Sequence, residues 1–124
     1  MFDRFDCWKY TDNHNCWDFV REFLIDRAGV PSEDVPKYGI CPTDKKAMTK
    51  AAREVQKTFT LCEPQQYAIA CHFVGRVIIH VGVVDGDIIR HTGKVQGTTK
   101  STVRDFEAMA QKTIYKIHRS LCQH

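Results

Sequence analysis

Apolar side chains recur at helical spacing in a stretch near the start of the chain. They lie at i, i+3, i+4, i+7 and i+8, so all of them fall on one face of an α-helix. Asn15 or Asn13 supplies a capping side chain before this stretch, and Gly29 followed by Pro31 ends it. The pattern predicts a first helix whose buried stripe consists of Cys16, Phe19, Val20, Phe23 and Leu24.

A second apolar stripe at helical spacing predicts another helix, from Thr43 to about Phe59. This stripe consists of Met48, Ala51, Ala52, Val55 and Phe59. Basic residues cover much of the remaining surface, namely Lys45, Lys46, Lys50, Arg53 and Lys57. A solvated helix face accounts for such a charge pattern, and nucleic-acid binding is the alternative that it leaves open.

The second half of the chain changes from helical spacing to runs of β-branched and apolar residues. Tyr67–Val74 and Val77–Val84 read as strands joined by a turn at Gly75-Arg76. The Asp85-Gly86 pair that follows is a strong signal for a two-residue hairpin loop, and Asp87–His91 reads as the next strand. These strands are expected to form an antiparallel sheet.

The last part of the chain contains one more helix and one more strand. Val103–Gln111 reads as a short helix capped by Thr102, with Phe106 and Met109 on its inner side, and Thr113–Arg119 reads as a strand. Helices that precede an antiparallel sheet indicate the α+β class. Because the chain has 124 residues and shows no linker or internal repeat, we expect a single domain over residues 1–124.

Composition narrows the class of protein without identifying its function. The mean hydropathy is −0.38, and no apolar run approaches the length of a membrane span. The net charge of +3 is too small to imply a nucleic-acid partner by itself. The stretch from Met1 to Asp6 has no basic region followed by an apolar one. We therefore expect synthesis in the cytoplasm without a signal peptide.

The cysteines admit two interpretations. An even number of cysteines in a short chain fits a disulfide framework, but the lack of a visible signal peptide favours reduced thiols. No pair has C-x-x-C spacing, and no Cys/His pairs repeat at zinc-finger intervals, so we expect no metal site and no cofactor. The six residues are Cys7, Cys16, Cys41, Cys62, Cys71 and Cys122.

The predicted hairpin brings two histidines together. If Asp85 and Gly86 form the loop, His80 lies directly opposite His91 on one face of the sheet. Directly opposed residues have Cβ atoms about 4.5–5.5 Å apart. The two imidazoles are then expected to share one proton at most, because two imidazolium ions at that distance repel each other.

Cys16 begins the first predicted helix, where the positive end of the helix dipole favours the thiolate. A histidine nearby would lower the pKa of the thiol further and make it a nucleophile near neutral pH. A cysteine at a helix N-terminus that faces two histidines has the make-up of a thiol hydrolase. In that interpretation Cys16 attacks a carbonyl, His80 is its base and His91 orients His80.

Two segments carry this pattern, namely Asn15-Cys16-Trp17-Asp18-Phe19-Val20 and His80-Val81-Gly82-Val83-Val84-Asp85-Gly86-Asp87-Ile88-Ile89-Arg90-His91. They resemble the NlpC/P60 cysteine peptidases, and more closely the short versions that tailed phages encode as tail-tip proteins. The resemblance extends from about Trp8 to Arg119. The usual signature around the family's nucleophile is Asp-Cys-Ser-Gly, whereas the sequence around Cys16 is closer to phage and CHAP-like relatives.

The resemblance implies a papain-like α+β fold, with N-terminal helices packed on an antiparallel sheet. It implies a catalytic triad of Cys16, His80 and His91 that cleaves amide bonds in peptidoglycan stem peptides, commonly D-γ-glutamyl to diaminopimelate, through an acyl-enzyme. It also implies phage tail proteins as partners and the virion tail as a destination. The family places a tyrosine near the oxyanion site, and Tyr10 is the candidate for it in this chain.

Several expectations around the site stay open. Trp17 either lines a substrate groove or packs under the second helix. His14 is expected in a polar loop, and Cys71 and His72 are expected to be structural. Two other functions also remain open: a different papain-like thiol amidase or acyltransferase, and a structural tail-assembly module whose triad is vestigial.

Overall fold

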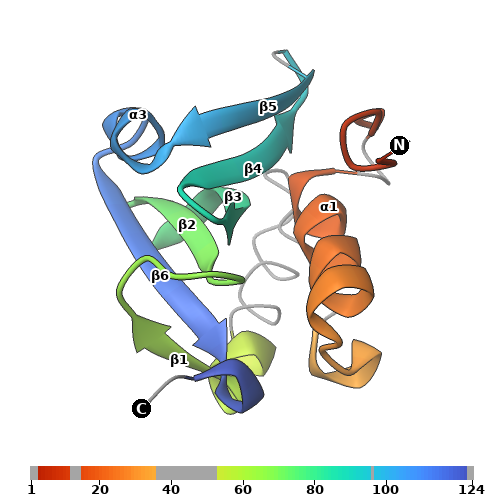
Figure 1. Ribbon diagram of the computed structural model, residues 1–124. Helices are drawn as coiled ribbons and strands as arrows, with labels where there is room; N and C mark the ends of the chain where they lie inside the picture. The colour runs from red at the N-terminus through yellow and green to blue at the C-terminus, as the bar shows by residue number, and fades with distance from the viewer. Residues whose placement is uncertain (1–2, 12–14, 36–52, 96, 123–124) are drawn as a thin grey trace.

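The computed structural model describes residues 3–11, 15–35, 53–95 and 97–122. These residues form an α+β fold in which one antiparallel sheet carries helices on its two faces (Figure 1). The class agrees with the prediction from the sequence. No helix among the described residues is long and apolar enough to cross a membrane.

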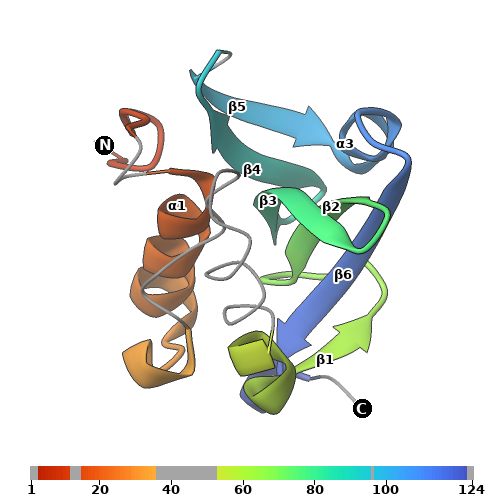
Figure 2. The same cartoon turned by 180° about the vertical axis from the view of Figure 1, so that it is seen from behind.

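The sheet has six strands in the order β1-β6-β2-β3-β4-β5, and every pair of neighbours is antiparallel. Helix α1 lies along one side of this sheet, whereas α3 lies at the other side, next to β5 (Figures 1 and 2). The strands are β1 (Phe59–Cys62), β2 (Ile69–Val74), β3 (Val77–Asp85), β4 (Ile88–Gly93), β5 (Gly97–Thr102) and β6 (Lys112–His118).

Helix α1 (Cys16–Phe23) begins where the sequence predicts it, and Asn15 is its N-cap. The Asn15 side chain accepts hydrogen bonds from the backbone N–H groups of Trp17 and Asp18, at 3.0 and 3.3 Å. The Asp18 carboxylate accepts in return from the Asn15 N–H at 3.0 Å, which completes a capping box. The helix continues as a π-helical turn (Leu24–Ala28) and ends at Gly29, whose φ of 71° is the left-handed conformation of a helix stop.

The second predicted helix lies largely outside the described residues, because positions 36–52 are not part of them. Residues 53–58 are helical and lead directly into β1, so the helix ends one residue before Phe59. Strands β1 and β5 were not predicted. The short helix α3 (Val103–Ala108) has the predicted Thr102 cap, through the Asp105 N–H at 3.1 Å, and buries Phe106. The prediction for Met109 is wrong, since its side chain is 52% exposed just after the helix.

The β3–β4 hairpin differs from the prediction in its register. Asp85 pairs with Ile88, so the loop residues are Gly86 and Asp87 rather than Asp85 and Gly86. Gly86 has a φ of 67°, and the tight hairpin turns place positive φ at the first loop residue. Asp85 stays in β3, where its carboxylate contacts Arg90 at 3.3 Å. The correction shifts the pairing by two residues, which leaves each side chain on the predicted face of the sheet.

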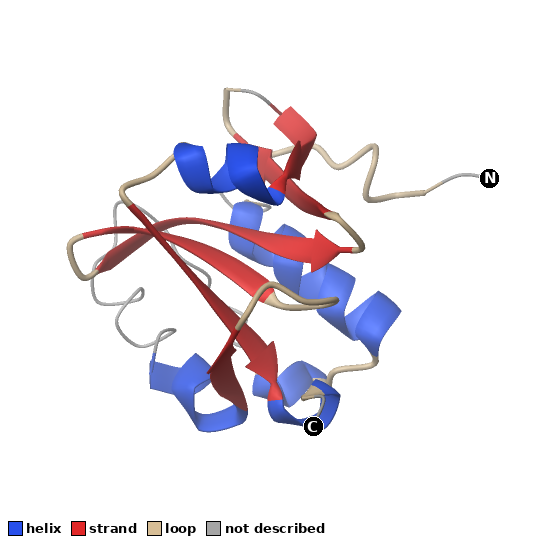
Figure 3. Cartoon of the chain, turned by 60° about the vertical axis from the view of Figure 1, so that its left-hand side comes forward, coloured by secondary structure: helices blue, strands red, loops and turns tan. Residues whose placement is uncertain are grey.

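Two apolar clusters pack against the sheet, one on each face. The α1-side cluster joins α1 to alternate residues of β2 and β3, among them Cys71, Val81 and Val83. The α3-side cluster is smaller and is centred on Phe106, with Ala70, Val84, Ile89 and Tyr115 around it. Figure 3 shows α3 above the strands and α1 behind them. Each strand between the helices therefore presents successive side chains to different clusters.

Candidate functional site

The imidazoles of His80 and His91 form a hydrogen bond, with 3.0 Å between His80 Nε2 and His91 Nδ1. Their ring centroids lie 5.1 Å apart, and the rings meet nearly at right angles. The sequence predicts two adjacent imidazoles, and the structure brings them together. It does so through diagonal rather than directly opposed positions, a separation that long side chains can span.

Gly82 makes this approach possible. The pairing of β3 with β4 runs from Asp85 and Ile88 to Val83 and Arg90, and Gly82 lies against His91 at the next position. A Cβ atom on Gly82 would lie 3.2 Å from His91 Cβ and 3.1 Å from the Arg90 carbonyl oxygen. Because glycine has no Cβ, β4 can lie close to β3 at the level of His91.

The ring of His72 lies beside those of His80 and His91, a contact that the sequence pattern does not predict. It lies directly opposite His80 in the β2–β3 pairing, and the two ring centroids are 5.6 Å apart. His72 Nε2 donates to the Phe106 carbonyl oxygen at 2.7 Å, and its ring stacks on Phe106 with 3.9 Å between centroids. Cys71 points to the other face of the sheet, as strand alternation requires. The sequence holds a signal for this contact, because His72 and His80 lie on two strands joined by a short turn and fall opposite each other when the strands are paired.

Ser101 completes the group. His91 Nε2 lies 2.9 Å from Ser101 Oγ, so the hydrogen bonds run without interruption from His80 through His91 to the Ser101 hydroxyl. Ser101 lies in β5, two residues after Thr99, which is the cross-strand partner of His91. The sequence pattern does not indicate Ser101, because it does not predict β5.

Burial keeps the two imidazoles uncharged. Loss of solvation, together with the neighbouring His91 and His72, lowers the pKa of His80 to about 3. Burial likewise lowers the pKa of His91 to about 4, with a contribution from His72. Both directions follow from the penalty for placing a cation in an apolar site beside other bases. Near pH 7 each ring is therefore neutral, with a proton on one nitrogen and a lone pair on the other.

Cys16 is the first residue of α1 and is 6% exposed. Burial raises the pKa of its thiol, and the Asp18 carboxylate raises it too. The backbone N–H groups of Val81, Trp17 and Cys16 itself oppose that shift, since they stabilise the thiolate. The sequence predicts a lowered pKa. The structure gives the opposite direction, because loss of solvation outweighs the helix N-terminus.

The thiol and the imidazoles approach β3 from different faces. Val81 packs with Cys16 and Cys71 in the α1-side cluster, so the preceding residue, His80, projects toward Phe106. Within the described residues no hydrogen bond joins the Cys16 thiol to either imidazole. The structure thus brings His80 and His91 together but places Cys16 at the backbone of Val81 on the other face of β3, so the arrangement expected from the sequence, in which the thiol faces the two imidazoles, is not the one observed.

Trp17 and Tyr10 are the two weaker site residues expected from the sequence. Trp17 is 2% exposed and belongs to the α1-side cluster, so its indole is a core side chain and not an open groove wall. Tyr10 is partly buried in the segment that leads into α1. His14, which the sequence analysis assigned to a polar loop, lies outside the described residues.

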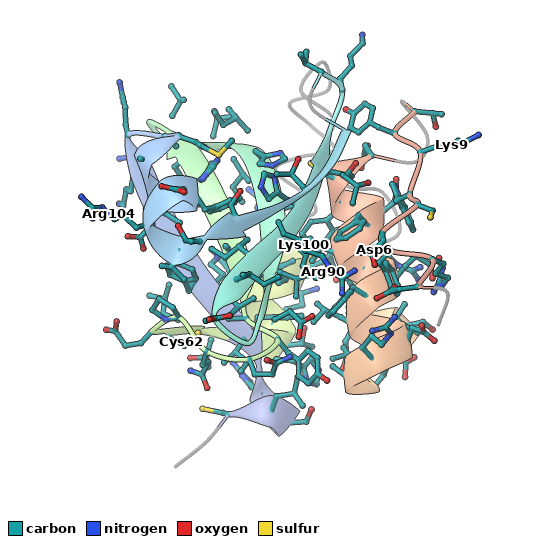
Figure 4. All side chains as sticks on the ribbon, turned by 45° about the horizontal axis from the view of Figure 1, so that its top comes forward. Asp6, Lys9, Cys62, Arg90, Lys100 and Arg104 are labelled. Carbon is teal, nitrogen blue, oxygen red and sulfur yellow. The ribbon has the colours of Figure 1, made fainter. Side chains whose placement is uncertain are left out.

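A buried arginine fastens the N-terminal segment beside α1. Arg90 precedes His91 and projects to the opposite face, where its Nη2 contacts Asp6 at 2.9 Å and Asp3 at 3.2 Å. Figure 4 shows Arg90, Asp6 and Lys100 close together, and Lys100 Nζ lies 3.4 Å from the same Asp6 carboxylate. The Arg90 side chain is 5% exposed, so these carboxylates balance a charge that has little contact with water.

The described residues contain no group of three His, Cys, Asp or Glu side chains arranged to hold a metal ion. Of the three clustered histidines, His80 and His91 instead bond to each other, His91 bonds also to the Ser101 hydroxyl, and His72 bonds to the Phe106 carbonyl oxygen. Comparison of the chain with protein-family models, curated proteins and solved structures finds no match.

Proposed function

We propose that the protein is a thiol hydrolase in which Cys16 is the nucleophile, His80 the general base and His91 the residue that orients His80. The hydrogen bond between His80 and His91, one residue along β3 from the site where the Cys16 thiol meets the strand, is the observation that supports the proposal most. The order of a helix followed by an antiparallel sheet is compatible with a papain-like fold, which we propose for the chain.

The pKa directions favour a resting state with a neutral thiol and a neutral imidazole. A thiol whose pKa is raised stays protonated near pH 7, and an imidazole whose pKa is lowered stays unprotonated and is a weaker base than an ordinary histidine. Transfer of the thiol proton therefore accompanies attack on the substrate instead of preceding it. Such a transfer requires contact between Cys16 and His80, whose side chains lie on different faces of β3, so the proposal includes a rearrangement of β3 that brings the two together when substrate binds.

The reaction then follows from the free positions on the two side chains. His80 Nε2 is engaged with His91, which leaves Nδ1 to accept the proton from Cys16 Sγ as sulfur bonds to the amide carbonyl carbon. The tetrahedral intermediate collapses when His80 Nδ1–H donates that proton to the leaving amine, and an acyl-thioester remains on Cys16. Water then attacks the thioester while His80 accepts a proton from it, and the proton returns to the departing sulfur.

Backbone groups near Cys16 are suited to stabilise the charge that develops on the substrate oxygen. The N–H of Cys16 lies at the capped N-terminus of α1, where backbone donors point away from the helix. We propose this N–H as one oxyanion donor and the Tyr10 hydroxyl as a second. The chemistry needs no metal or organic cofactor.

The substrate class in this proposal is the stem peptide of peptidoglycan, with a D-γ-glutamyl to diaminopimelate amide as the bond cleaved. It depends on the resemblance of the segments around Cys16 and His80 to NlpC/P60 peptidases. From the same resemblance we propose that the protein, after synthesis in the cytoplasm, joins the tail proteins of a phage particle. The alternative of an acyltransferase has the same first half of the reaction, in which the acyl-thioester forms on Cys16, and differs in that an acceptor other than water attacks the thioester.

Digestion of purified sacculi, followed by mass analysis of the released fragments, tests the proposal. The wild-type chain is compared with Cys16→Ala and with Cys71→Ala, which removes a buried thiol of the same cluster that the mechanism does not use. We expect wild type and Cys71→Ala to release fragments with new amino and carboxyl ends and Cys16→Ala to release none. Equal release by Cys16→Ala, with circular dichroism showing that all three are folded, would refute the proposal.

A further inference from the structure

Ser120, His118 and Asp34 form a second hydrogen-bonded group, separate from the histidines of β3 and β4. Ser120 Oγ lies 2.7 Å from His118 Nδ1, and His118 Nε2 lies 2.8 Å from Asp34 Oδ2. The group joins the turn η2 (Ser32–Asp34) to the end of β6 and to the turn η3 (Arg119–Leu121), which are 84 residues apart. In Figure 1, η3 is the dark blue turn beside the C-terminus, at the other end of the molecule from the start of α1.

A backbone group fixes which nitrogen of His118 carries the proton. The Ser120 N–H donates to His118 Nδ1 at 3.2 Å. A backbone N–H can only donate, and a protonated Nδ1 would place two N–H groups against each other, so Nδ1 has the lone pair and Nε2 has the proton. Nε2–H then donates to the Asp34 carboxylate. Because the Ser120 hydroxyl faces the same lone pair on Nδ1, it donates to that nitrogen as well.

These contacts give the three side chains the roles of a nucleophile, its base and the carboxylate that orients the base. A serine hydroxyl that donates to an unprotonated imidazole passes its proton to that nitrogen when the oxygen attacks a carbonyl carbon. A carboxylate that accepts from the other ring nitrogen holds the tautomer and stabilises the imidazolium that forms. Catalytic triads of this kind are recognised by geometry and roles and not by the order of their members along the chain.

Neighbouring groups hold the base and the carboxylate in place and leave the serine open to solvent. His118 is 7% exposed, and its ring meets the Phe59 ring edge-on with 5.3 Å between centroids. The Asp34 carbonyl oxygen accepts from Thr58 Oγ1 at 3.1 Å, which fastens η2 beside β1. Ser120 is exposed. A cap of η3 needs only the bond from the Ser120 N–H to His118, so the contacts of the Ser120 hydroxyl and of Asp34 are additional to capping.

We propose that Ser120 is the nucleophile of a second hydrolytic site, with His118 as its general base and Asp34 as the residue that orients His118. The substrate class is a small carboxylic ester, because the site is open to water and an alcohol leaves more readily than an amine. Ser120 Oγ bonds to the carbonyl carbon while its proton passes to His118 Nδ1, and the leaving alcohol takes that proton when its C–O bond breaks. Water then attacks the acyl-serine, His118 accepts a proton from it, and the proton returns to Ser120 Oγ. This site does not depend on Cys16.

Two measurements on the full chain test the second site. The first is the rate at which a fluorophosphonate phosphonylates Ser120, with release of fluoride, followed by peptide mass spectrometry in wild type, His118→Gln and Asp34→Asn. Ser32→Ala is the matched control, because Ser32 is an exposed serine in the same turn as Asp34. The second is hydrolysis of p-nitrophenyl butyrate by Cys16→Ala, with and without Ser120→Ala, so that the thiol proposed above makes no contribution. Circular dichroism checks that each variant is folded.

We expect the phosphonyl group on Ser120 in wild type and Ser32→Ala, and a rate roughly 100-fold lower in His118→Gln, the lower end of what a positioned general base contributes. The rate should also fall in Asp34→Asn, which keeps the test available if the buried His118 does not tolerate substitution. Hydrolysis of the ester should persist in Cys16→Ala and disappear when Ser120→Ala is added. An adduct absent from Ser120, an equal rate in Asp34→Asn, or ester hydrolysis that Ser120→Ala leaves unchanged would overturn the proposal.

Discussion

His80 and His91 form a 3.0 Å hydrogen bond although neither is the direct cross-strand partner of the other. Gly82, two residues after His80, occupies the position against His91. The bond therefore depends on a diagonal contact across β3 and β4, which the missing side chain of Gly82 permits. Both the register of the hairpin and the identity of one glycine control the geometry of the pair.

Gly82→Ala adds only a methyl group, but it should move His91 away from His80 and destabilise the fold. The added Cβ would lie 2.7 Å from Ile89 Cγ2, with backbone and His91 atoms close behind, so β4 must shift. We expect a loss of about 1–3 kcal/mol in the free energy of unfolding, as for other overpacked interiors. Urea denaturation measures it, with Gly75→Ala as the comparison: there the added Cβ meets nothing within 4 Å and only the positive φ is strained. A Gly82→Ala variant as stable as wild type would contradict the close packing at Gly82.

The stability of the fold should fall as the pH drops below the normal range of histidine. In the unfolded chain His80 and His91 titrate near 6.5, whereas in the folded chain their pKa values are about 3 and 4. Between these limits the unfolded chain binds more protons, so acid favours unfolding. The stabilisation is complete above about pH 6.5 and is lost progressively as the pH falls toward the folded pKa values.

Urea midpoints at about pH 7.5 and about pH 5 test this dependence, since the carboxylates change little in that window. We expect a lower midpoint at the acidic value for wild type and a smaller difference for His80→Gln, which removes one of the titrating groups. A wild-type midpoint that does not change between the two pH values would show that the pair is not protected from protonation.

The Cys16 thiol should ionise later than an ordinary thiol. Burial raises its pKa, so the thiolate should form above about pH 8.5, where a free cysteine titrates. The ¹³C chemical shift of Cys16 Cβ, followed across the pH range in a chain labelled at cysteine, reports the ionisation. The exposed Cys7 serves as the reference in the same sample. A midpoint for Cys16 well below that of a free cysteine would favour a thiolate–imidazolium pair in the resting protein instead of a neutral pair.

Much of the fold could be predicted from the sequence because its signals are local. The apolar stripe of α1, the Asn15 cap and the Gly29 stop lie within a few residues of one another, and the structure has each of them. The Thr102 cap of α3 is local in the same way. Strand β5 was missed because Gly97–Thr102 is polar in composition, and only its pairing with β4 defines it as a strand.

The site was harder to predict, since it depends on register and burial. The hairpin loop is Gly86-Asp87 and not Asp85-Gly86. This difference of one residue decides whether His80 faces His91 directly or diagonally. The raised pKa of Cys16 results from packing against β2 and β3, and helix position alone predicts the opposite direction. Ser101 lies near His91 only because β5 pairs with β4. No residue pattern near the histidines in the sequence indicates this contact.

The central claim is that Cys16 is acylated with His80 as its base, and acetylation by p-nitrophenyl acetate tests it most directly. Peptide mass spectrometry of wild type, Cys16→Ala and His80→Ala after brief exposure near pH 7 locates and times the acetyl group. The account predicts an acetyl group on Cys16 that appears and then decays in wild type, with both steps slower in His80→Ala. Acetylation of the exposed Cys7 alone, or equal rates at Cys16 with and without His80, would contradict it.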